Sequence, residues 1–469
     1  MKKDHMAMVA LVLIPLYLLT VVNAFWPTQA VSADENRTLQ QMPAVSWQSL
    51  KSGAFTRTFE EFFSDQFPFR SFFVQVNHQM VAWMKQPFAG EVEIVTGPGG
   101  EIDRGEGERL EPDPEDKVVL PTPTDKPPVS ATPTAMPSAS ADPSPTAVPT
   151  ATPQPTATPQ PTAAPTAGPT PGATGKVETV SGVIILDNRA MELYYFSESR
   201  SERYVKLINR LQGKLSSAQV YSLVAPTALE FYSPDDYHDG SSNQANAISS
   251  IYGRLDSNVR TVDAYSKLRA KWEDYIYFRT DHHWTARGAF CAYQAFAEQA
   301  GFAPLALDSF TTGVVPGDFL GSLYRYTKSS KLKNNPDFVE YFLPAVESEG
   351  IAFTSTAMSE GYRIQAVRTE ISSSNKYLAF IQGDNPLVRL TTSLTNGRKI
   401  VVLKESFGNA LVPFLLNHYQ EVYVIDPRSL SADLPAFIAK HGIQEVLVVN
   451  YAFAVTNSKW LDGFEAMIG

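Results

Sequence analysis

The sequence is poor in the residues that form covalent cross-links and metal clusters. It contains one cysteine, Cys291, in 469 residues. An intramolecular disulfide and a zinc finger are therefore both excluded. Histidine is also scarce: only seven are present, and most stand alone in the sequence without any spacing pattern (His5, His78, His238, His418 and His441).

Positive charge is scarce as well. The chain has 39 Lys and Arg against 49 Asp and Glu, a formal net charge of -10, and it shows neither a Lys/Arg cluster nor a glycine-rich phosphate loop. A nucleic acid is therefore not expected as a partner, and nothing indicates a cofactor. What is present is a hydrophobic content of 43% and an aromatic content of 11%, which suffice for a sizeable core in one to three domains.

The N-terminal residues 1–26 are expected to be a membrane anchor or a signal peptide. Lys2 and Lys3 precede an apolar run over about residues 6–22, which has the flank and length of a transmembrane helix with the bulk of the protein exported. We favour an uncleaved anchor, because the run is long for a signal peptide and Trp26 suits the membrane interface. Cleavage after Val22-Asn23-Ala24 is the alternative.

Composition divides the remaining chain into three regions. Residues 27–100 are expected to form a partly helical N-terminal region, since phenylalanines recur there at helical spacing. Residues 101–176 are expected to form a disordered linker: eight Asp and Glu stand against three Lys and Arg in 101–118, and 16 prolines follow between Pro121 and Pro171. A segment of this kind buries little apolar surface and would extend over roughly 150 Å as polyproline II.

Residues 177–469 alternate between strand and helix patterns. This alternation predicts an α/β fold with a largely parallel sheet, in which ligands lie at the carboxyl ends of the strands. The expected strands cover residues 183–186, 220–225, 273–278, 400–403, 422–425 and 445–449, and the expected helices cover residues 198–215, 285–300, 410–417 and 435–441.

The most informative motif is Asp281-His282-His283-Trp284, directly after the expected strand 273–278. A histidine and a carboxylate can form two members of a hydrolase-type triad. Asp281 and His283 are two positions apart, so both side chains face the same way in an extended segment, and His282 faces the opposite way. Trp284 is expected to pack in the core rather than to serve as a sugar platform.

A candidate nucleophile, Ser406, follows the expected strand 400–403 at the start of a helix. There its hydroxyl can project from the sheet edge, and main-chain N–H groups can stabilise an oxyanion. A serine hydroxyl needs an adjacent base, which a neutral imidazole held by a carboxylate supplies. The plain alternative is that Ser406 caps the helix.

Two asparagines and the histidine pair complete the candidates. Asn385, in an expected strand-to-turn segment, and Asn409 are candidate oxyanion or substrate contacts. The alternative for Asn385 is an ordinary turn residue. His282 and His283 are alternative metal ligands, although no companion group with ligand spacing accompanies them.

These residues resemble a known family. The run 277–285 looks like the signature of the DHHW family of exported bacterial proteins, which are similar to the alginate O-acetylation proteins AlgJ and AlgX with their SGNH-hydrolase-like domain. The wider group has Asp-x-His-Trp, here Asp281, His283 and Trp284, and a serine later in the chain, here Ser406. This order is a circular permutation of the usual SGNH order. Segments 35–37, 65–70 and 226–227 also match.

The resemblance covers nearly all of 27–469 except 101–176, and it implies an SGNH-hydrolase-like three-layer α/β/α domain over 177–469. It further implies an extracytoplasmic serine O-acetyltransferase or acetylesterase that acts on a cell-surface polysaccharide, with a membrane protein as acyl donor. Ser406 would attack, His283 would act as base and then as acid, and Asp281 would orient His283. The alternative is a non-catalytic module that binds polysaccharide or organises an export complex.

Overall fold

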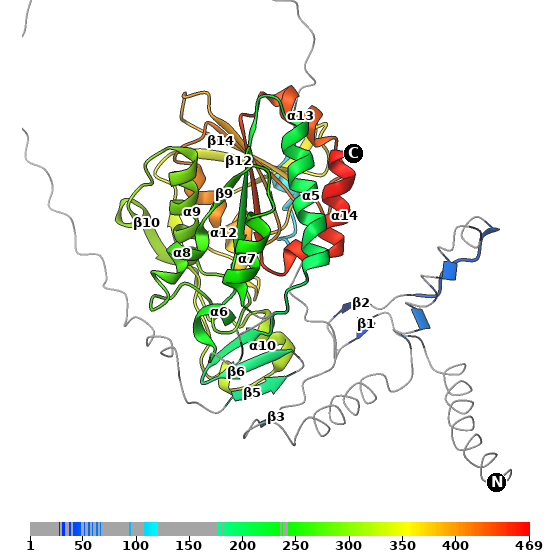
Figure 1. Ribbon diagram of the computed structural model, residues 1–469, viewed down its shortest axis with the longest axis vertical. Helices are drawn as coiled ribbons and strands as arrows, with labels where there is room; N and C mark the ends of the chain where they lie inside the picture. The colour runs from blue at the N-terminus through cyan, green and yellow to red at the C-terminus, as the bar shows by residue number, and fades with distance from the viewer. Residues whose placement is uncertain are drawn as a thin grey trace, which may run out of the picture.

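The computed structural model of the protein describes residues 107–120, 177–180, 182–234, 237 and 243–469, together with short stretches between residues 28 and 94. Figure 1 shows a large sheet with helices on both sides and a smaller lobe below it, around β5, β6 and α10. The expected anchor at residues 1–26 and the proline-rich residues 121–176 lie outside the described residues. No helix within the described ranges is both long and apolar enough to cross a membrane.

A nine-stranded mixed sheet forms the centre of the fold, in the order β4-β13-β12-β14-β16-β15-β17-β8-β9. Neighbours from β16 to β9 run parallel, and neighbours from β4 to β16 run antiparallel. The strands are, along the sheet, Lys117–Val119 (β4), Glu360–Ile364 (β13), Ser348–Phe353 (β12), Leu387–Thr392 (β14), Glu421–Ile425 (β16), Lys399–Lys404 (β15), Glu445–Tyr451 (β17), Gln219–Ala225 (β8) and Arg260–Val262 (β9).

The prediction of a largely parallel sheet is therefore right for one half and wrong for the other. The parallel half consists of apolar runs that are buried along almost their whole length, as in β15, β16 and β17, which is typical of strands covered on both faces. The strands β12, β13 and β14 follow one another without a crossover helix, and such connections favour antiparallel pairing.

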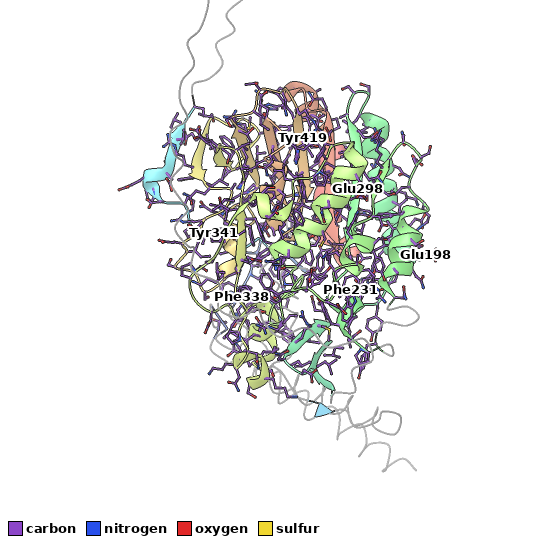
Figure 2. The ribbon with its side chains drawn as sticks, turned by 90° about the vertical axis from the view of Figure 1, so that its left-hand side faces the viewer. Glu198, Phe231, Glu298, Phe338, Tyr341 and Tyr419 are labelled. Atoms are coloured by element: carbon purple, nitrogen blue, oxygen red, sulfur yellow. The ribbon has the colours of Figure 1, made fainter. Side chains whose placement is uncertain are left out.

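Helices cover both faces of the sheet. On one face they pack into the buried cluster around Leu207 and Val446, and on the other into the cluster around Phe296 and Leu447. The first set is Glu198–Lys214 (α5), Gln244–Tyr252 (α7), Leu434–His441 (α13) and Ser458–Ile468 (α14), and the second is Ala264–Arg269 (α8), Ala286–Ala300 (α9) and Phe407–Leu415 (α12). Figure 2 shows α9, marked by Glu298, in front of the sheet and α5, marked by Glu198, at its side.

Local sequence signals explain the bounds of the helix after the histidine motif. α9 begins where the Thr285 side chain accepts the N–H of Gly288, and it ends at Gly301, whose φ of 75° is left-handed. A threonine at the N-cap is a usual signal for the start of a helix, and a glycine at the C-terminal end is a usual signal for its stop. The prediction of a helix over 285–300 is confirmed, and α12 begins three residues earlier than predicted, at Phe407.

A second, four-stranded sheet forms the smaller lobe and supports the histidine motif. Its strands are Glu93–Ile94 (β3), Val177–Val180 (β5), Val183–Leu186 (β6) and Arg189–Glu192 (β7), and the helices Ser322–Thr327 (α10) and Ser330–Lys333 (α11) pack on it. The buried Arg189 donates to the carbonyls of Tyr277 and Phe278 at 3.0 and 2.9 Å. The lobe therefore fixes the chain just before Asp281.

The remaining elements are small. They are the two-stranded pairs Val31–Ser32 (β1) with Arg37–Thr38 (β2) and Thr311–Val314 (β10) with Glu340–Leu343 (β11), the short helix Leu229–Tyr232 (α6), and the 3-10 helices Pro114–Asp116 (η2), Leu307–Ser309 (η5), Lys376–Ala379 (η6) and Ala454–Thr456 (η7).

Residues 107–120, here called the strap, correct the prediction of a linker that begins at residue 101. β4 pairs with β13 at the edge of the large sheet, and Figure 2 shows the strap along that edge. The main-chain N–H of Leu110 donates to the carbonyl of Gln382 at 3.0 Å, and that of Asp384 donates to the carbonyl of Glu108 at 2.9 Å. Main-chain pairing, rather than burial of apolar side chains, holds this acidic segment.

The predicted strand at 273–278 is wrong. This segment is a series of turns with a single bridge between Tyr277 and Trp284, and the N–H of Thr285 returns to the carbonyl of Ile276 at 2.9 Å. Its apolar side chains are buried in a loop, so apolar content alone does not distinguish it from a strand. The strand predicted before Asn385 is likewise replaced, by η6 and a tight turn.

Candidate active site

Ser406 lies between the end of β15 and the first residue of α12, at the carboxyl edge of the parallel strands. It occupies the N-cap position, yet its side chain makes no capping hydrogen bond to the helix. Instead its Oγ lies 2.7 Å from Nε2 of His283. The capping alternative therefore does not account for this serine.

The structure brings together Asp281, His283 and Ser406 in one hydrogen-bonded chain. Nδ1 of His283 lies 2.6 Å from Oδ1 of Asp281, while Nε2 faces the serine. All three side chains are buried. A carboxylate at Nδ1 holds the proton on that nitrogen, which leaves Nε2 free to accept the serine proton.

The carboxylate of Asp281 is held in a polar cradle. Oδ1 also accepts the main-chain N–H of His283 at 3.0 Å, and Oδ2 accepts that of Ser322 at 2.8 Å. Burial by itself would raise the pKa of Asp281, but the nearby His283 and His282 and these hydrogen bonds outweigh it and hold the pKa far below its ordinary value. Asp281 is therefore ionised throughout the neutral range.

Asp337 fixes the turn that presents the motif. Its carboxylate accepts the main-chain N–H groups of Arg279 and Thr280 and the hydroxyl of Thr280. The hydroxyl of Tyr275 donates to it as well. Asp337 is buried at the edge of this loop, so it replaces the ladder hydrogen bonds that a strand would have supplied.

His282 does not face away from His283, in contrast to the prediction. The segment is a turn rather than an extended strand, because Asp281 accepts the N–H of His283 two residues later. The two imidazole rings therefore lie 3.7 Å apart between centres, and Nδ1 of His282 lies 2.7 Å from Oγ of Ser322. His282 thus packs against His283 and is hydrogen-bonded to Ser322.

Aromatic side chains enclose the imidazole of His283. The ring of Tyr377 stacks on it with centres 3.9 Å apart and planes 11° apart, and the Tyr377 hydroxyl donates to the carbonyl of Ser406 at 3.0 Å. Trp284 is fully buried, and its indole N–H donates to the carbonyl of Phe407 at 2.9 Å. Both contacts tie the loop of the histidine to the start of α12.

Glu405 is a neighbour that the sequence analysis did not identify. One carboxyl oxygen accepts the N–H of Phe407 at 2.9 Å and lies 3.4 Å from Oγ of Ser406, and the other accepts the N–H of Tyr451 at 3.0 Å. Burial raises the pKa of Glu405 to about 8, more than these N–H groups lower it. A carboxyl next to a candidate nucleophile is the sequence signal, but its burial is visible only in the fold.

The two candidate oxyanion asparagines are engaged elsewhere. The main-chain N–H of Asn385 donates to the carbonyl of Gly383 at 3.1 Å, and its side-chain amide donates to the carbonyl of Ile381 at 3.2 Å. The amide of Asn409 donates to Asp384 at 3.0 Å. The structure therefore does not bring either amide to Ser406, whose own main-chain N–H has no partner among the described residues.

A buried ion network lies behind the serine. Asp384 accepts Nζ of Lys404 at 2.6 Å and a guanidinium nitrogen of Arg428 at 2.6 Å, and Arg428 also binds Asp426 at 2.7 Å. The N–H of Gly107 in the strap donates to Asp384 at 3.0 Å. The two cations match the two carboxylates, as a buried cluster requires. The strap is thereby joined to Lys404, the last residue of β15, two residues before Ser406.

Asp281, His282 and His283 also meet the distance criterion for a metal site, with ligand atoms within 4.8 Å of one another. Both ring nitrogens of His283 are already in hydrogen bonds with Asp281 and Ser406. A metal would have to displace one of these bonds, because each imidazole nitrogen has one position to offer. The geometry therefore fits a proton-transfer chain better than a metal centre.

Comparisons with known proteins agree with this architecture. A sequence model described as "DHHW protein" matches residues 161–425. The crystal structure of a DHHW family protein from Eubacterium siraeum DSM 15702 is similar, with 30% identity and a TM-score of 0.56, over 62% of this chain and 96% of that one. Among curated proteins, no sequence matches significantly.

Two further structures are similar at lower identity. Bacillus cereus PatB1 with a sulfonyl adduct has 19% identity and a TM-score of 0.50, over 59% of this chain and 97% of that one. This likeness concerns the fold alone. The O-acetyltransferase domain of Pseudomonas putida AlgJ has 14% identity and a TM-score of 0.35, over 61% of this chain and 98% of that one, which is too loose a match to carry an argument.

Proposed function

The chain belongs to the DHHW family, and we propose that it is a serine acyl-transfer enzyme, an O-acetyltransferase or acetylesterase for a cell-surface polysaccharide. The observation that carries the proposal is the 2.7 Å distance between Oγ of Ser406 and Nε2 of His283, with Asp281 2.6 Å from the far nitrogen. A nucleophile and a base within hydrogen-bond reach, with the base held by a third group, are what covalent acyl transfer needs.

In the first step Ser406 is acylated. Oγ attacks the acetyl carbonyl while its proton moves to Nε2 of His283, and the carbonyl electron pair moves to oxygen. Asp281 stays ionised and stabilises the imidazolium, consistent with its strongly lowered pKa. When the tetrahedral intermediate collapses, the leaving oxygen takes the proton from Nε2 and acetyl-Ser406 remains.

The oxyanion is assigned to the N-terminus of α12. Among the described residues the main-chain N–H of Ser406 has no partner, whereas the N–H of Phe407 donates to Glu405 at 2.9 Å. A rotation of the Glu405 side chain would release this second N–H. Main-chain donors of this kind stabilise the charge that develops in the transition state.

In the second step a hydroxyl group of the polysaccharide, or water, takes the place of the leaving group. His283 accepts its proton at Nε2, the new oxygen bonds to the acyl carbon, and the proton passes to Oγ as Ser406 departs. A polysaccharide hydroxyl gives O-acetylation, and water gives ester hydrolysis. The same three residues serve both outcomes.

The finer architectural and cellular assignments belong to this proposal. The two helical layers around the sheet fit an SGNH-hydrolase-like domain over 177–469, with Asp, His and Ser in permuted order. The apolar residues 6–22 would tether the domain outside the cytoplasm as a single-pass anchor, or a cleaved signal would release it. A membrane protein would deliver the acyl group, and the proline-rich residues 121–176 would act as a spacer.

A second candidate is a non-catalytic module that binds polysaccharide. It is favoured by the closed state of the site, since the serine is only 5% exposed and Glu405 takes up the Phe407 N–H. The short distance from Ser406 to His283 argues against it, because a binding module has no need for an aligned base. Turnover separates the two candidates.

The test is hydrolysis of an aryl acetate by the full chain. The proposal expects measurable turnover that Ser406→Ala abolishes with the thermal unfolding midpoint retained. Ser217→Ala is the matched control, since Ser217 is exposed in the turn before β8, at the opposite edge of the sheet. Turnover that persists in Ser406→Ala refutes the assignment of the nucleophile, and inactive wild-type protein favours the binding module.

A further inference from the structure

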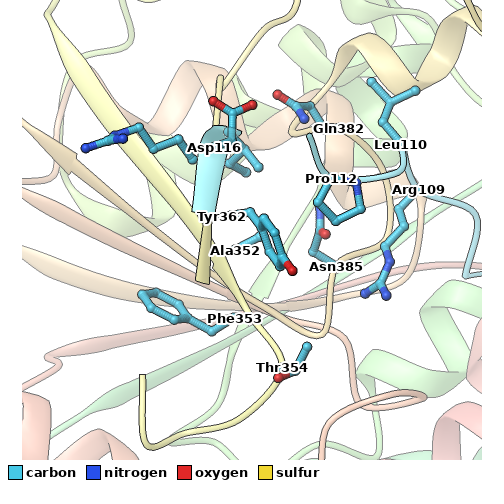
Figure 3. A pocket seen from close by; sticks show the side chains of 12 residues that line it. Arg109, Leu110, Pro112, Asp116, Ala352, Phe353, Thr354, Tyr362, Gln382 and Asn385 are labelled. Carbon is cyan, nitrogen blue, oxygen red and sulfur yellow. The ribbon is translucent and has the colours of Figure 1, made fainter. Parts of the chain in front are cut away.

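A pocket separate from the three triad residues opens where the strap meets the antiparallel half of the sheet. Its walls come from the strap, from β12 and β13, and from the turn at residues 382–385. Figure 3 shows the side chains of Arg109, Tyr362 and Asn385 around it, with Arg109 and the Tyr362 hydroxyl on the same side of the pocket as Asn385. The pocket exists only because the strap is part of the domain.

The pocket lies on the same edge of the sheet as Ser406. Phe353 pairs with Leu387, Leu387 with Ile425, and Ile425 with Leu403, so these residues form one row across β12, β14, β16 and β15. Three strand spacings correspond to about 14 Å. Ser406 lies three residues after Leu403 in this row, and Asn385 lies two residues before Leu387. A short oligosaccharide can span such a distance.

Two buried amides face the pocket. Gln382 and Asn385 are 6% and 7% exposed. Oε1 of Gln382 is held by the N–H of Gln365 at 3.0 Å, which leaves its amide nitrogen to donate. Asn385 uses one amide hydrogen on the carbonyl of Ile381, and its carbonyl oxygen has no partner among the described residues. Buried amides of this kind are costly unless a ligand or water completes their hydrogen bonds.

The guanidinium group of Arg109, on the strap, lines the pocket. Asp116 also lines it, whereas Arg363 is the residue after Tyr362 in β13, so its side chain points to the opposite face of the sheet. Neither arginine is in an ion pair within the described part of the chain. Guanidinium groups bind carboxylates through two parallel hydrogen bonds, and Tyr362 adds an aromatic surface with a hydroxyl group.

The turn that carries the amides is strained. Ile381, Gln382 and Gly383 have φ values of 45°, 57° and 93°, and a positive φ is a genuine outlier for a β-branched residue. Such conformations are unfavourable in themselves and are common at ligand clamps. A Cβ at Gly383 would lie 2.7 Å from Cα of Arg109, so the strap and the turn fit together only with glycine there.

From these features we infer that the pocket binds a saccharide unit that bears a carboxylate. The inference rests on the proposed function and deepens it, because it makes the acceptor an acidic polysaccharide held beside the serine. Arg109 binds the carboxylate, the amides of Gln382 and Asn385 bind ring hydroxyls, and Tyr362 contacts the ring. The strap residues 107–116 thus supply part of the acceptor site.

The test is calorimetric titration of the full chain with short oligogalacturonates, and with neutral gluco-oligosaccharides of equal length. We expect binding of the acidic series only, weakened about tenfold or more by Arg109→Ala, the loss expected for one charged hydrogen bond. Asn385→Asp places a negative charge in the pocket and should weaken binding by a similar factor. Arg269→Ala, which removes the same charge from α8 on the other side of the fold, should leave the affinity unchanged.

The inference fails if the neutral series binds as tightly, if neither series binds, or if Arg109→Ala and Arg269→Ala have equal effects. Because titration needs no turnover, these outcomes are independent of the aryl acetate assay. An inactive protein that still binds oligogalacturonate through Arg109 would overturn the acyl-transfer proposal and leave the pocket assignment intact. An active protein that does not bind oligogalacturonate would overturn the pocket assignment and leave the acyl-transfer proposal intact.

Discussion

A Cβ on Gly321 would lie 2.7 Å from Cγ of Asp281, and closer still to the Cβ and Oδ2 atoms of that residue. Gly321 precedes α10, whose first N–H group, that of Ser322, donates to the same carboxylate. The absence of a side chain at residue 321 is therefore a condition for the hydrogen bond that fixes Asp281.

Gly321→Ala should displace Asp281 and destabilise the protein. Overpacking of a rigid buried site typically costs about 1–3 kcal/mol, and aryl acetate turnover should fall with it, because His283 loses its orienting partner. Gly213→Ala in α5 is the control, since a Cβ there meets nothing within 4 Å; it should stabilise by about 0.5–1 kcal/mol. Equal unfolding midpoints for the two variants would contradict the role of Gly321.

Asp281→Asn should leave the fold nearly intact and remove most of the activity. The amide preserves the shape of the side chain but favours the wrong tautomer of His283, an exchange that lowers kcat by about 10⁴ in a well-studied serine protease. Steady-state kinetics on an aryl acetate, with circular dichroism as the fold control, measures this. A variant that keeps more than about a tenth of the activity would show that Asp281 does not orient the base.

Glu405 should make the stability depend on pH in a defined direction. Its pKa of about 8 in the fold lies above the ordinary 4.5, so its stabilising contribution is complete below 4.5 and is lost as the pH rises towards 8. The slope is up to about 1.4 kcal/mol per pH unit in that window. Denaturant unfolding of wild type and Glu405→Gln at several pH values measures it, and the difference between them should shrink as the pH falls.

The opposite trend would indicate that Glu405 is ionised in the fold. The wild type would then gain stability relative to Glu405→Gln as the pH rises. A carboxyl group whose pKa is lowered in the fold stabilises the protein at pH values above its ordinary pKa. Glu465→Gln is a useful control, since the pKa of this half-buried carboxyl is lowered by Arg203 and Arg210.

Removal of divalent metals should leave turnover unchanged. Nδ1 and Nε2 of His283 are both bound to protein groups, so the proposed mechanism routes no step through a metal. Dialysis against a chelator followed by the aryl acetate assay, with elemental analysis of the protein before and after, measures this. Activity that is lost with a stoichiometric metal and restored by its return would favour the cluster of Asp281, His282 and His283 as a metal site.

The sequence predicts the parts of this fold that local patterns encode. β15, β17 and α9 follow from apolar runs and from the Thr285 and Gly301 signals. The strap was not predictable, because its acidic composition indicates solvation, while main-chain pairing with β13 holds it. Two pairings of the antiparallel half, β4 with β13 and β14 with β16, likewise join strands that do not follow one another in the sequence, and single-sequence patterns do not contain such pairings.

The candidate site, too, is encoded only in part by local sequence patterns. The spacing of Asp281 and His283 and the position of Ser406 after a strand were sufficient to nominate three residues that the structure places in hydrogen-bond contact. Glu405 and Tyr377 were missed because their significance lies in burial and stacking against His283 and the start of α12. The turn at Asp281 reversed the expectation for His282, because an Asx-type turn brings neighbouring rings together where a strand separates them.

The most direct test of the central claim is the labelling of the folded protein with a fluorophosphonate, followed by mass mapping of the modified peptide. The account predicts one covalent adduct on Oγ of Ser406, formed at a rate that falls sharply in His283→Ala, because the imidazole is the base that activates the hydroxyl. An adduct on another residue, or a labelling rate that His283→Ala leaves unchanged, would contradict it.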